Sequence, residues 1–134
     1  MEMTAMRQSF GGADRGTPRR VAMSVRPELA EAIYNGIKCF EFRRCHVRIP
    51  VGSTVLLYEV RPVARLTGQF TVAEVIVGRA GDLIVLEPNS MAQEFAAAYL
   101  EGAVRASALR IESPVRWAAS VRMANPPQSY RFLD

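Results

Sequence analysis

The chain has 134 residues, of which 49% are hydrophobic and 22% charged, and its net charge is +4. These values are typical of one soluble globular domain that buries a core without needing disulfide staples. Two cysteines exclude a disulfide framework, and the only histidine, His46 beside Cys45, has no zinc-ligand spacing around it. Residues 1–20 lack the apolar region of a signal peptide, and no apolar run is as long as a membrane span. We therefore expect a cytoplasmic protein with no membrane partner, metal or other cofactor.

The positive charge is carried almost entirely by arginine. The sequence has sixteen arginines and one lysine, Lys38. Arginine is a planar cation that stays charged, whereas lysine is a compact ammonium whose pKa falls readily on burial. A lone lysine in such a background indicates a position that needs a point charge or a titratable amine.

The first fifty residues predict a tail, a strand, a helix and a second strand. Residues 1–20 are basic and rich in glycine, which is typical of a disordered tail. Residues 21–25 form an apolar run that predicts a buried strand. Pro27 favours the first position of a helix, and Gly36 favours its left-handed C-terminal cap. The pair Leu29 and Ile33 gives this helix one apolar face.

The strand after this helix carries the candidate site. Strict alternation places Phe40 and Phe42 on one face, with Glu41 and Arg43 on the other, about 7 Å apart along the chain. The same register puts Lys38 on the face opposite Glu41 unless the Gly36 turn re-aims it. A basic loop with Arg44, His46 and Arg48 follows.

The middle of the chain predicts a central strand, a long strand and a short one. Residues 54–58 are continuously apolar and favour the centre of a sheet, and residues 59–63 form a turn. Residues 66–77 give the longest strand signal, with Glu74 on its apolar face. That carboxylate must be paired or must face a wet cavity, unless a bulge turns it outward. Residues 83–86 favour one more short strand.

The last third predicts a helix and further strands. Ser90 fits the N-cap of a helix in a capping box with Gln93, and Gly102 ends it. We interpret the helical stripe of Met91, Phe95, Ala98 and Tyr99 as core packing. Residues 108–113 alternate like an exposed edge strand. Trp117 is expected to pack over the sheet, and Tyr130 with Phe132 to form a final strand. The pattern predicts an α+β fold with two main helices and a strongly bent antiparallel sheet.

Three blocks of sequence resemble the ASCH family of the PUA-like superfamily. Gly36, Lys38, Glu41 and Arg43 spell G-x-K-x-x-E-x-R after a short helix. The second block runs through residues 55–63 and 68–72, and the third is Pro126-Pro-Gln-Ser-Tyr. The resemblance covers roughly residues 21–133. It implies a PUA-like β-barrel domain over residues 21–134, in which the first helix and the following strand wall a cleft.

A nucleic-acid-binding module, most plausibly for RNA or a modified nucleotide or nucleoside, is the function we favour. PUA-like relatives bind RNA or modified bases, and a cationic groove with aromatic platforms suits single strands. Glu41 then holds Arg43 in place or accepts from a base amino group. The expected binding residues are Arg26, Lys38, Glu41, Arg43, Arg44, Tyr58 and Ser129, with Arg48 and Tyr34 as further donors and stacking faces.

A hydrolase is the alternative. Some ASCH-like proteins are similar to amidohydrolases acting on acylated pyrimidine nucleosides, and others to ribonucleases. Lys38 and Arg43 match the amidohydrolase pattern, but its threonine position is Glu41 here, so the hydroxyl's acylation chemistry is not available in the same way. Glu41 would instead act as general base, with Lys38 stabilising an oxyanion and Ser129 as a nearby hydroxyl.

A non-catalytic transcription coregulator is the third possibility. The sequence has no helix-turn-helix, which argues against sequence-specific binding of duplex DNA by this chain alone. Neither the natural ligand nor the oligomeric state follows from the sequence.

Overall fold

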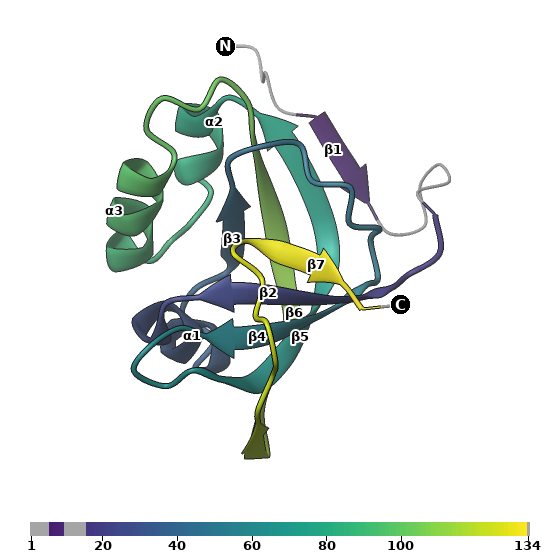
Figure 1. Ribbon diagram of the computed structural model, residues 1–134. Coiled ribbons are helices and arrows are strands. Elements are labelled where there is room, and N and C mark those ends of the chain that lie inside the picture. Colours follow the sequence, from purple (N-terminus) through teal and green to yellow (C-terminus); the bar gives the residue numbers. More distant parts are fainter. Residues whose placement is uncertain (1–5, 10–15, 134) are drawn as a thin grey trace.

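The computed structural model describes residues 6–9 and 16–133, and it has the expected α+β architecture (Figure 1). The described elements, in chain order, are β1 (Met6–Ser9), β2 (Arg20–Val25), α1 (Pro27–Tyr34), β3 (Phe40–Arg43), β4 (Thr54–Glu59), β5 (Arg65–Gly78), α2 (Ala80–Ile84), α3 (Ser90–Tyr99), β6 (Ala106–Val121) and β7 (Tyr130–Phe132). The tail predicted for residues 1–20 falls mainly outside this description, but within it Met6–Ser9 pairs with β5.

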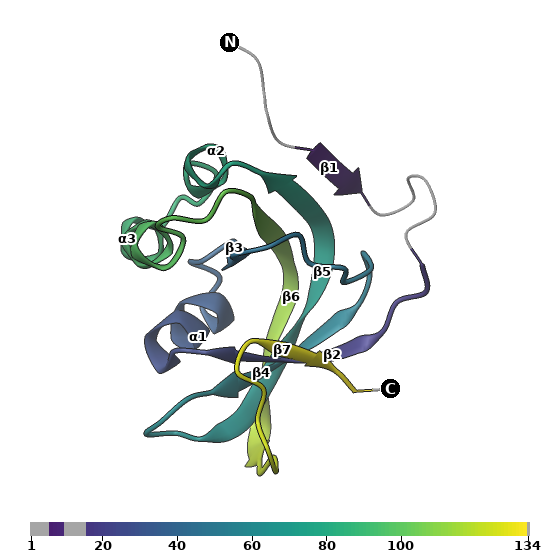
Figure 2. The ribbon, with the colours of Figure 1, turned by 45° about the horizontal axis from the view of Figure 1, so that its top comes forward.

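The strands form one curled sheet in the order β3-β6-β5-β4-β2-β7, with β1 joining the edge of β5 beyond β4. Figures 1 and 2 show this sheet bending into a half-barrel, with α2 and α3 together on one side and α1 beside β2. The strong bend is therefore confirmed. The sheet is mixed rather than wholly antiparallel, because β2 and β4 run parallel. Parallel neighbours need a crossover connection, and α1 with β3 and its loop supplies it.

Two apolar clusters stabilise the half-barrel. The larger lies inside the curl, where fully buried Met23, Leu57 and Phe70 pack with Ile33 of α1. The smaller joins Phe40 and Phe42 of β3 to α2 and α3 through Leu83 and Leu100. Because β3 contributes to the second cluster through its phenylalanines, its other face is left for Glu41 and Arg43.

Two predicted strands differ from the structure. Residues 83–86 were expected to be a strand, but Leu83 and Ile84 end the short helix α2. A short apolar run does not by itself distinguish a buried helical turn from a strand. Residues 108–113 were expected at an exposed edge, but they belong to the 16-residue β6, whose first part lies between β3 and β5.

The buried carboxylate predicted on β5 is paired. Glu74 is only 7% exposed, and its Oε1 accepts from Arg110 Nε of β6 at 2.8 Å. The pairing that the sequence allowed is therefore present, and the register between β5 and β6 also shifts between Val72 and Glu74. Trp117 of β6 is partly buried, and its Nε1 donates to Gln69 Oε1 at 3.1 Å on β5.

Candidate functional site

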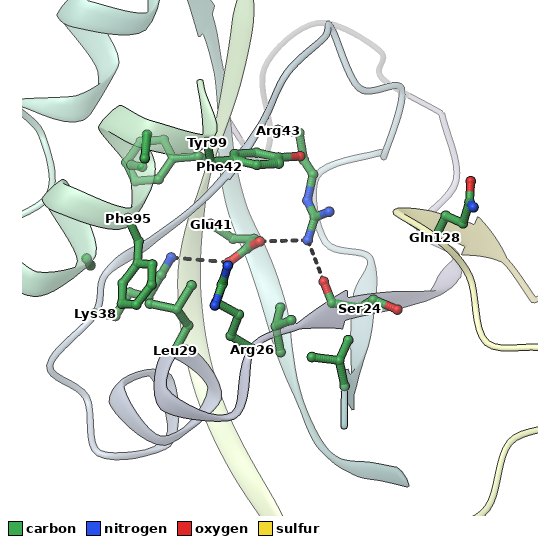
Figure 3. Close-up of a pocket in the computed structure, with 15 residues that line it drawn as sticks. Ser24, Arg26, Leu29, Lys38, Glu41, Phe42, Arg43, Phe95, Tyr99 and Gln128 are labelled. Carbon is green, nitrogen blue, oxygen red and sulfur yellow. Dashed lines mark hydrogen bonds and ion pairs between the residues drawn. The ribbon is translucent and has the colours of Figure 1, made fainter. Parts of the chain in front are cut away.

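A cavity of about 420 Å³ lies between the end of β2, α1, β3 and α3. Figure 3 shows the polar side chains of β3 on one side of it and aromatic side chains of α3 on another. The residues that line it are Ser24, Val25, Arg26, Leu29, Lys38, Glu41, Phe42, Arg43, Val60, Ala92, Phe95, Ala96, Ala98, Tyr99 and Gln128. Four of the seven predicted binding residues are therefore brought together around one cavity.

The turn after α1 directs Lys38 into this cavity. Gly36 has a φ of +76°, and the backbone N–H groups of Ile37 and Lys38 both donate to Ala32 O. Lys38 therefore precedes β3 and does not follow the alternation of that strand. Its Nζ lies 3.2 Å from Glu41 Oε1 and donates to Phe40 O. The re-aiming that the sequence left open is what the structure shows.

Glu41 lies between two cations. Its Oε1 faces Lys38, while its Oε2 accepts from Arg43 Nη2 at 2.7 Å (Figure 3). Arg43 Nη2 also donates to Ser24 O at 3.1 Å, and its Nη1 donates to Ser129 Oγ at 3.2 Å. The three charged side chains are between 2% and 8% exposed. They form one continuous row, which we call the Lys38–Glu41–Arg43 row.

The electrostatics of the row keep Glu41 ionised. Burial raises the pKa of Glu41, but the charges of Lys38 and Arg43 and their hydrogen bonds outweigh it, so the pKa lies below its ordinary value. A carboxylate held by two cations is a weak proton acceptor, because protonation would break both ion pairs. This arrangement argues against Glu41 as the general base of a hydrolase.

The polar network of Arg43 is not complete. Its Nε is buried and has no hydrogen-bond partner within the described part of the chain. Buried donors are nearly always paired, so an unpaired one at a cavity wall is typical of a site that changes its contacts on binding.

Helix α3 supplies the aromatic wall, which corrects the prediction of a core stripe. The residues that face the interior are Ala92, Ala96 and Leu100, each at most 4% exposed. Phe95 is half-buried and Tyr99 is 41% exposed, and both line the cavity. The helix begins one residue earlier than predicted, since the N-cap is Asn89, whose Oδ1 accepts from Ala92 N at 2.8 Å.

Arg26 stands at the exposed end of the cavity. Its guanidinium carbon lies 5.2 Å from the centre of the Phe95 ring, within the range of a cation–π contact. Leu29 of α1 lines the same wall. A cation and an aromatic ring are thus presented together at the mouth.

The remaining predicted residues lie outside the cavity lining. Tyr58 is buried within β4, and Arg44 is exposed, with its Nη1 donating to Tyr99 O at 2.7 Å and Glu101 O at 3.0 Å at the end of α3. Ser129 is exposed and touches the row only through Arg43. The hydroxyls of Tyr34 and Thr67 lie 2.8 Å apart in a separate cluster with Glu59 and Arg116.

A buried glutamate that sequence reasoning missed supports the site. Glu87 is fully buried, and its carboxylate accepts from the backbone N–H groups of Cys39, Phe40 and Asn89 at 2.9–3.3 Å. It therefore joins the start of β3 to the start of α3, the two elements that form opposite walls of the cavity. Its position between Leu86 and Pro88 gives no periodic signal.

Other classes of site find no support in the described residues. No group of three His, Cys, Asp or Glu side chains is arranged to hold a metal ion there. Cys39 and Cys45 are both free. No helix in the same part of the chain is long and apolar enough to cross a bilayer.

Comparison with protein families agrees with this geometry. The profile of the ASCH domain matches residues 23–115, which include the end of β2, all of α1, the Lys38–Glu41–Arg43 row and α3. The chain belongs to the ASCH-domain family. ASCH domains have a PUA-like fold that is associated with RNA binding and ribonuclease activity.

Solved structures show the same fold. Two variants of an ASCH protein from Zymomonas mobilis, one serine-to-alanine and one tyrosine-to-phenylalanine, each match with a TM-score of 0.75 and 23% identity. Each match covers 87% of this chain, and 89% and 91% of the respective variants. A further structure of ASCH from the same organism matches with a TM-score of 0.72 and 24% identity, over 90% of both chains. A search of curated proteins gives no match.

Proposed function

We propose that this ASCH domain binds single-stranded RNA by taking one nucleotide into the cavity beside the Lys38–Glu41–Arg43 row. The observation that carries the proposal is the combination, in one cavity, of a buried charged row and partly exposed aromatic rings. Both features carry a cost for the folded chain. A buried ion cluster costs desolvation energy, and a half-exposed Phe95 leaves apolar surface in water.

The size of the cavity supports a single nucleotide as the occupant. Small-molecule sites typically enclose about 300–1,000 Å³, and this cavity has about 420 Å³. A nucleic-acid duplex does not enter such a space, whereas one unstacked base with its sugar does. Sequence-specific RNA recognition mostly uses unstacked bases of single strands.

The charge of the cavity supports an anionic ligand. Arg26, Lys38 and Arg43 against Glu41 leave two positive charges in excess, three cations minus one carboxylate. Arg26 is exposed at the mouth and is the cation best placed to meet a backbone phosphate. The buried row lines the same cavity.

The aromatic wall supports base stacking. Phe95 and Tyr99 are one helical turn apart on α3, so their side chains lie on one face of that helix. Stacking on an aromatic ring contributes about 1–3 kcal/mol per base in single-strand binding. Simple binding is favoured over hydrolysis because the lowered pKa of Glu41 makes it a poor base.

The test is a titration of the purified chain with a fluorescently labelled single-stranded RNA of mixed sequence, at several salt concentrations. Arg26→Ala and Tyr99→Ala are each expected to weaken binding by about tenfold or more, from lost charge-assisted contacts and stacking. Arg122→Ala, which removes an exposed arginine outside the cavity, is the matched control and is expected to bind like the wild type. Log affinity is expected to fall by about 0.7 per log salt for each phosphate contacted.

Two results would overturn the proposal. One is wild-type affinity in both cavity variants, and the other is duplex RNA binding as tightly as the single strand. The RNA is recovered and analysed after the titration, because cleavage that Glu41→Gln abolishes would make the site that of a ribonuclease instead.

A further inference from the structure

The hydrogen-bonding capacity left over in the Lys38–Glu41–Arg43 row forms a pattern. A lysine ammonium has three N–H donors. That of Lys38 gives one to Phe40 O and one to Glu41 Oε1, so one donor remains. The Nη2 of Arg43 gives its two N–H groups to Glu41 and Ser24 O, while Nη1 gives one to Ser129 Oγ. One N–H of that Nη1 therefore remains as well.

Glu41 retains acceptor capacity between these two donors. Each carboxylate oxygen has two lone pairs, and each receives one hydrogen bond, Oε1 from Lys38 and Oε2 from Arg43. Figure 3 shows the order along the row as Lys38, Glu41, Arg43. The unused capacity along the row thus reads donor, acceptor, donor, and the unpaired Nε–H of Arg43 adds to the donors at the arginine end.

We propose that this row selects uracil as the base that enters the cavity, a specificity that rests on the proposed function. The pairing edge of uracil carries the carbonyl O4, the N3–H group and the carbonyl O2, which read acceptor, donor, acceptor. Lys38 and Arg43 donate to the two carbonyl oxygens, and Glu41 accepts from N3–H. These three hydrogen bonds pair every polar group on that edge of uracil.

The other RNA bases leave groups unpaired against the row. Cytosine presents an amino donor, then the N3 acceptor, then O2, so its amino group meets a cation and its N3 meets the Glu41 carboxylate. Adenine likewise presents an amino donor to a cation and a ring acceptor to the Glu41 carboxylate. Guanine matches at O6 and N1–H but ends in an amino donor facing a cation. A buried polar group left unpaired costs about 1–3 kcal/mol.

The exposure of the charged side chains agrees with a ligand whose base points toward the row. The side chains of the row are at most 8% exposed, whereas Arg26 is exposed at the mouth. A base inserted toward the row leaves its phosphate at Arg26 and its face against Phe95 or Tyr99. The reverse orientation would place a phosphate against the Glu41 carboxylate, which repels it.

Calorimetric titration with uridine, cytidine and N3-methyluridine 5′-monophosphates tests this specificity. We expect uridine monophosphate to bind at least tenfold more tightly than the other two, since N3-methylation removes the N–H that Glu41 accepts from. Glu41→Gln is expected to reduce the ratio of uridine to cytidine affinities toward one, because the amide can donate to cytosine N3 as well as accept from uracil N3–H. Arg122→Ala is the control and is expected to keep the ratio.

The outcomes separate the two proposals. Equal affinities for uridine and cytidine monophosphates, or unimpaired binding of N3-methyluridine monophosphate, overturn uracil selection and leave RNA binding standing. Failure to bind both the mononucleotides and the single-stranded RNA overturns both proposals. Because the ratio compares two ligands on one preparation, partial unfolding of a variant does not change it.

Discussion

Glu41 of β3 and Glu87, which precedes α3, are both buried, and different partners balance their charges. Glu41 balances its charge with the side chains of Lys38 and Arg43. Glu87 is fully buried, and its carboxylate accepts from three backbone N–H groups. Both satisfy the rule that a buried charge must be paired or hydrogen-bonded.

The difference in partners teaches which carboxylate is available to a ligand. Backbone N–H groups are fixed by β3 and α3, so Glu87 stabilises a single arrangement of the two cavity walls. Lysine and arginine side chains have several donors each and retain spare ones, and only Glu41 lines the cavity. Glu87 therefore belongs to the scaffold, and Glu41 belongs to the candidate site.

Glu41→Gln is the change with the largest expected effect. It leaves two buried cations without their carboxylate, and breaking a buried ion pair in this way typically costs about 3–5 kcal/mol. Urea unfolding at neutral pH measures the loss. We also expect millimolar phosphate to raise the melting temperature of this variant more than that of the wild type, since an anion replaces the missing charge. Equal shifts would contradict a cavity open to anions.

The stability loss caused by Glu41→Gln is expected to depend on pH. The pKa of Glu41 in the folded chain lies below its ordinary value, so its ion pairs contribute fully above the unfolded pKa of about 4.3. The contribution falls as the pH drops below that value and through the folded pKa. The stability difference between wild type and Glu41→Gln is therefore expected to be constant from pH 7 to about 5 and to shrink at lower pH. A decline that begins above pH 5 would mean a raised pKa.

Glu87→Gln is expected to have the next largest effect. The amide keeps one acceptor oxygen but turns an NH₂ group toward backbone donors, and hydrogen bonds to charged groups are each worth about 1.5–3 kcal/mol. We expect a loss of this order in urea unfolding and faster hydrogen exchange at the N–H groups of Cys39 and Phe40. Phosphate is expected to give no extra stabilisation, in contrast to Glu41→Gln. Rescue by phosphate would place Glu87 in the site as well.

Arg44→Ala is expected to have the smallest effect. Arg44 donates to carbonyls at the C-terminal end of α3 from an exposed position, and such interactions contribute about 0.3–1 kcal/mol. RNA affinity is expected to change much less than with Arg26→Ala. A comparable loss of RNA binding would make Arg44 a direct ligand contact, as the sequence had predicted.

Local signals in the sequence predicted the parts of the fold that depend on neighbouring residues. Pro27 and Gly36 mark the start of α1 and the turn after it, and the spacing in β3 puts Glu41 and Arg43 together. Lys38 joins them because the Gly36 turn re-aims it, which the sequence left open. The alternation in β3 predicted that Phe40 and Phe42 face away from the charged residues. These features arise from φ preferences and strand periodicity, which act within a few residues.

The parts that were wrong or missed depend on distant contacts. Helix α3 has two apolar stripes. The stripe with Ala92 and Ala96 faces the core because small side chains allow close approach. The stripe with Phe95 and Tyr99 supplies the aromatic rings of the cavity. Glu87 accepts from amides 47 and 48 residues away, and any residue type offers such donors. No local sequence pattern predicts which stripe of α3 faces the core or which backbone donors Glu87 binds.

The contacts of residues 127–132 have a consequence for folding kinetics. Ser24 donates to Pro127 O and Ser129 O, Arg43 donates to Ser129 across 86 residues of sequence, and β7 pairs with β2. Contacts between such distant segments form slowly, because the conformational entropy of closing a long loop is lost before the contacts stabilise the chain. The hydrogen-bond network of Arg43 is therefore complete only when this segment docks, although its bonds to Glu41 and Ser24 O do not involve the segment. We expect ligand binding to arise with that last docking event, so that a partly folded chain, however compact, does not capture the ligand.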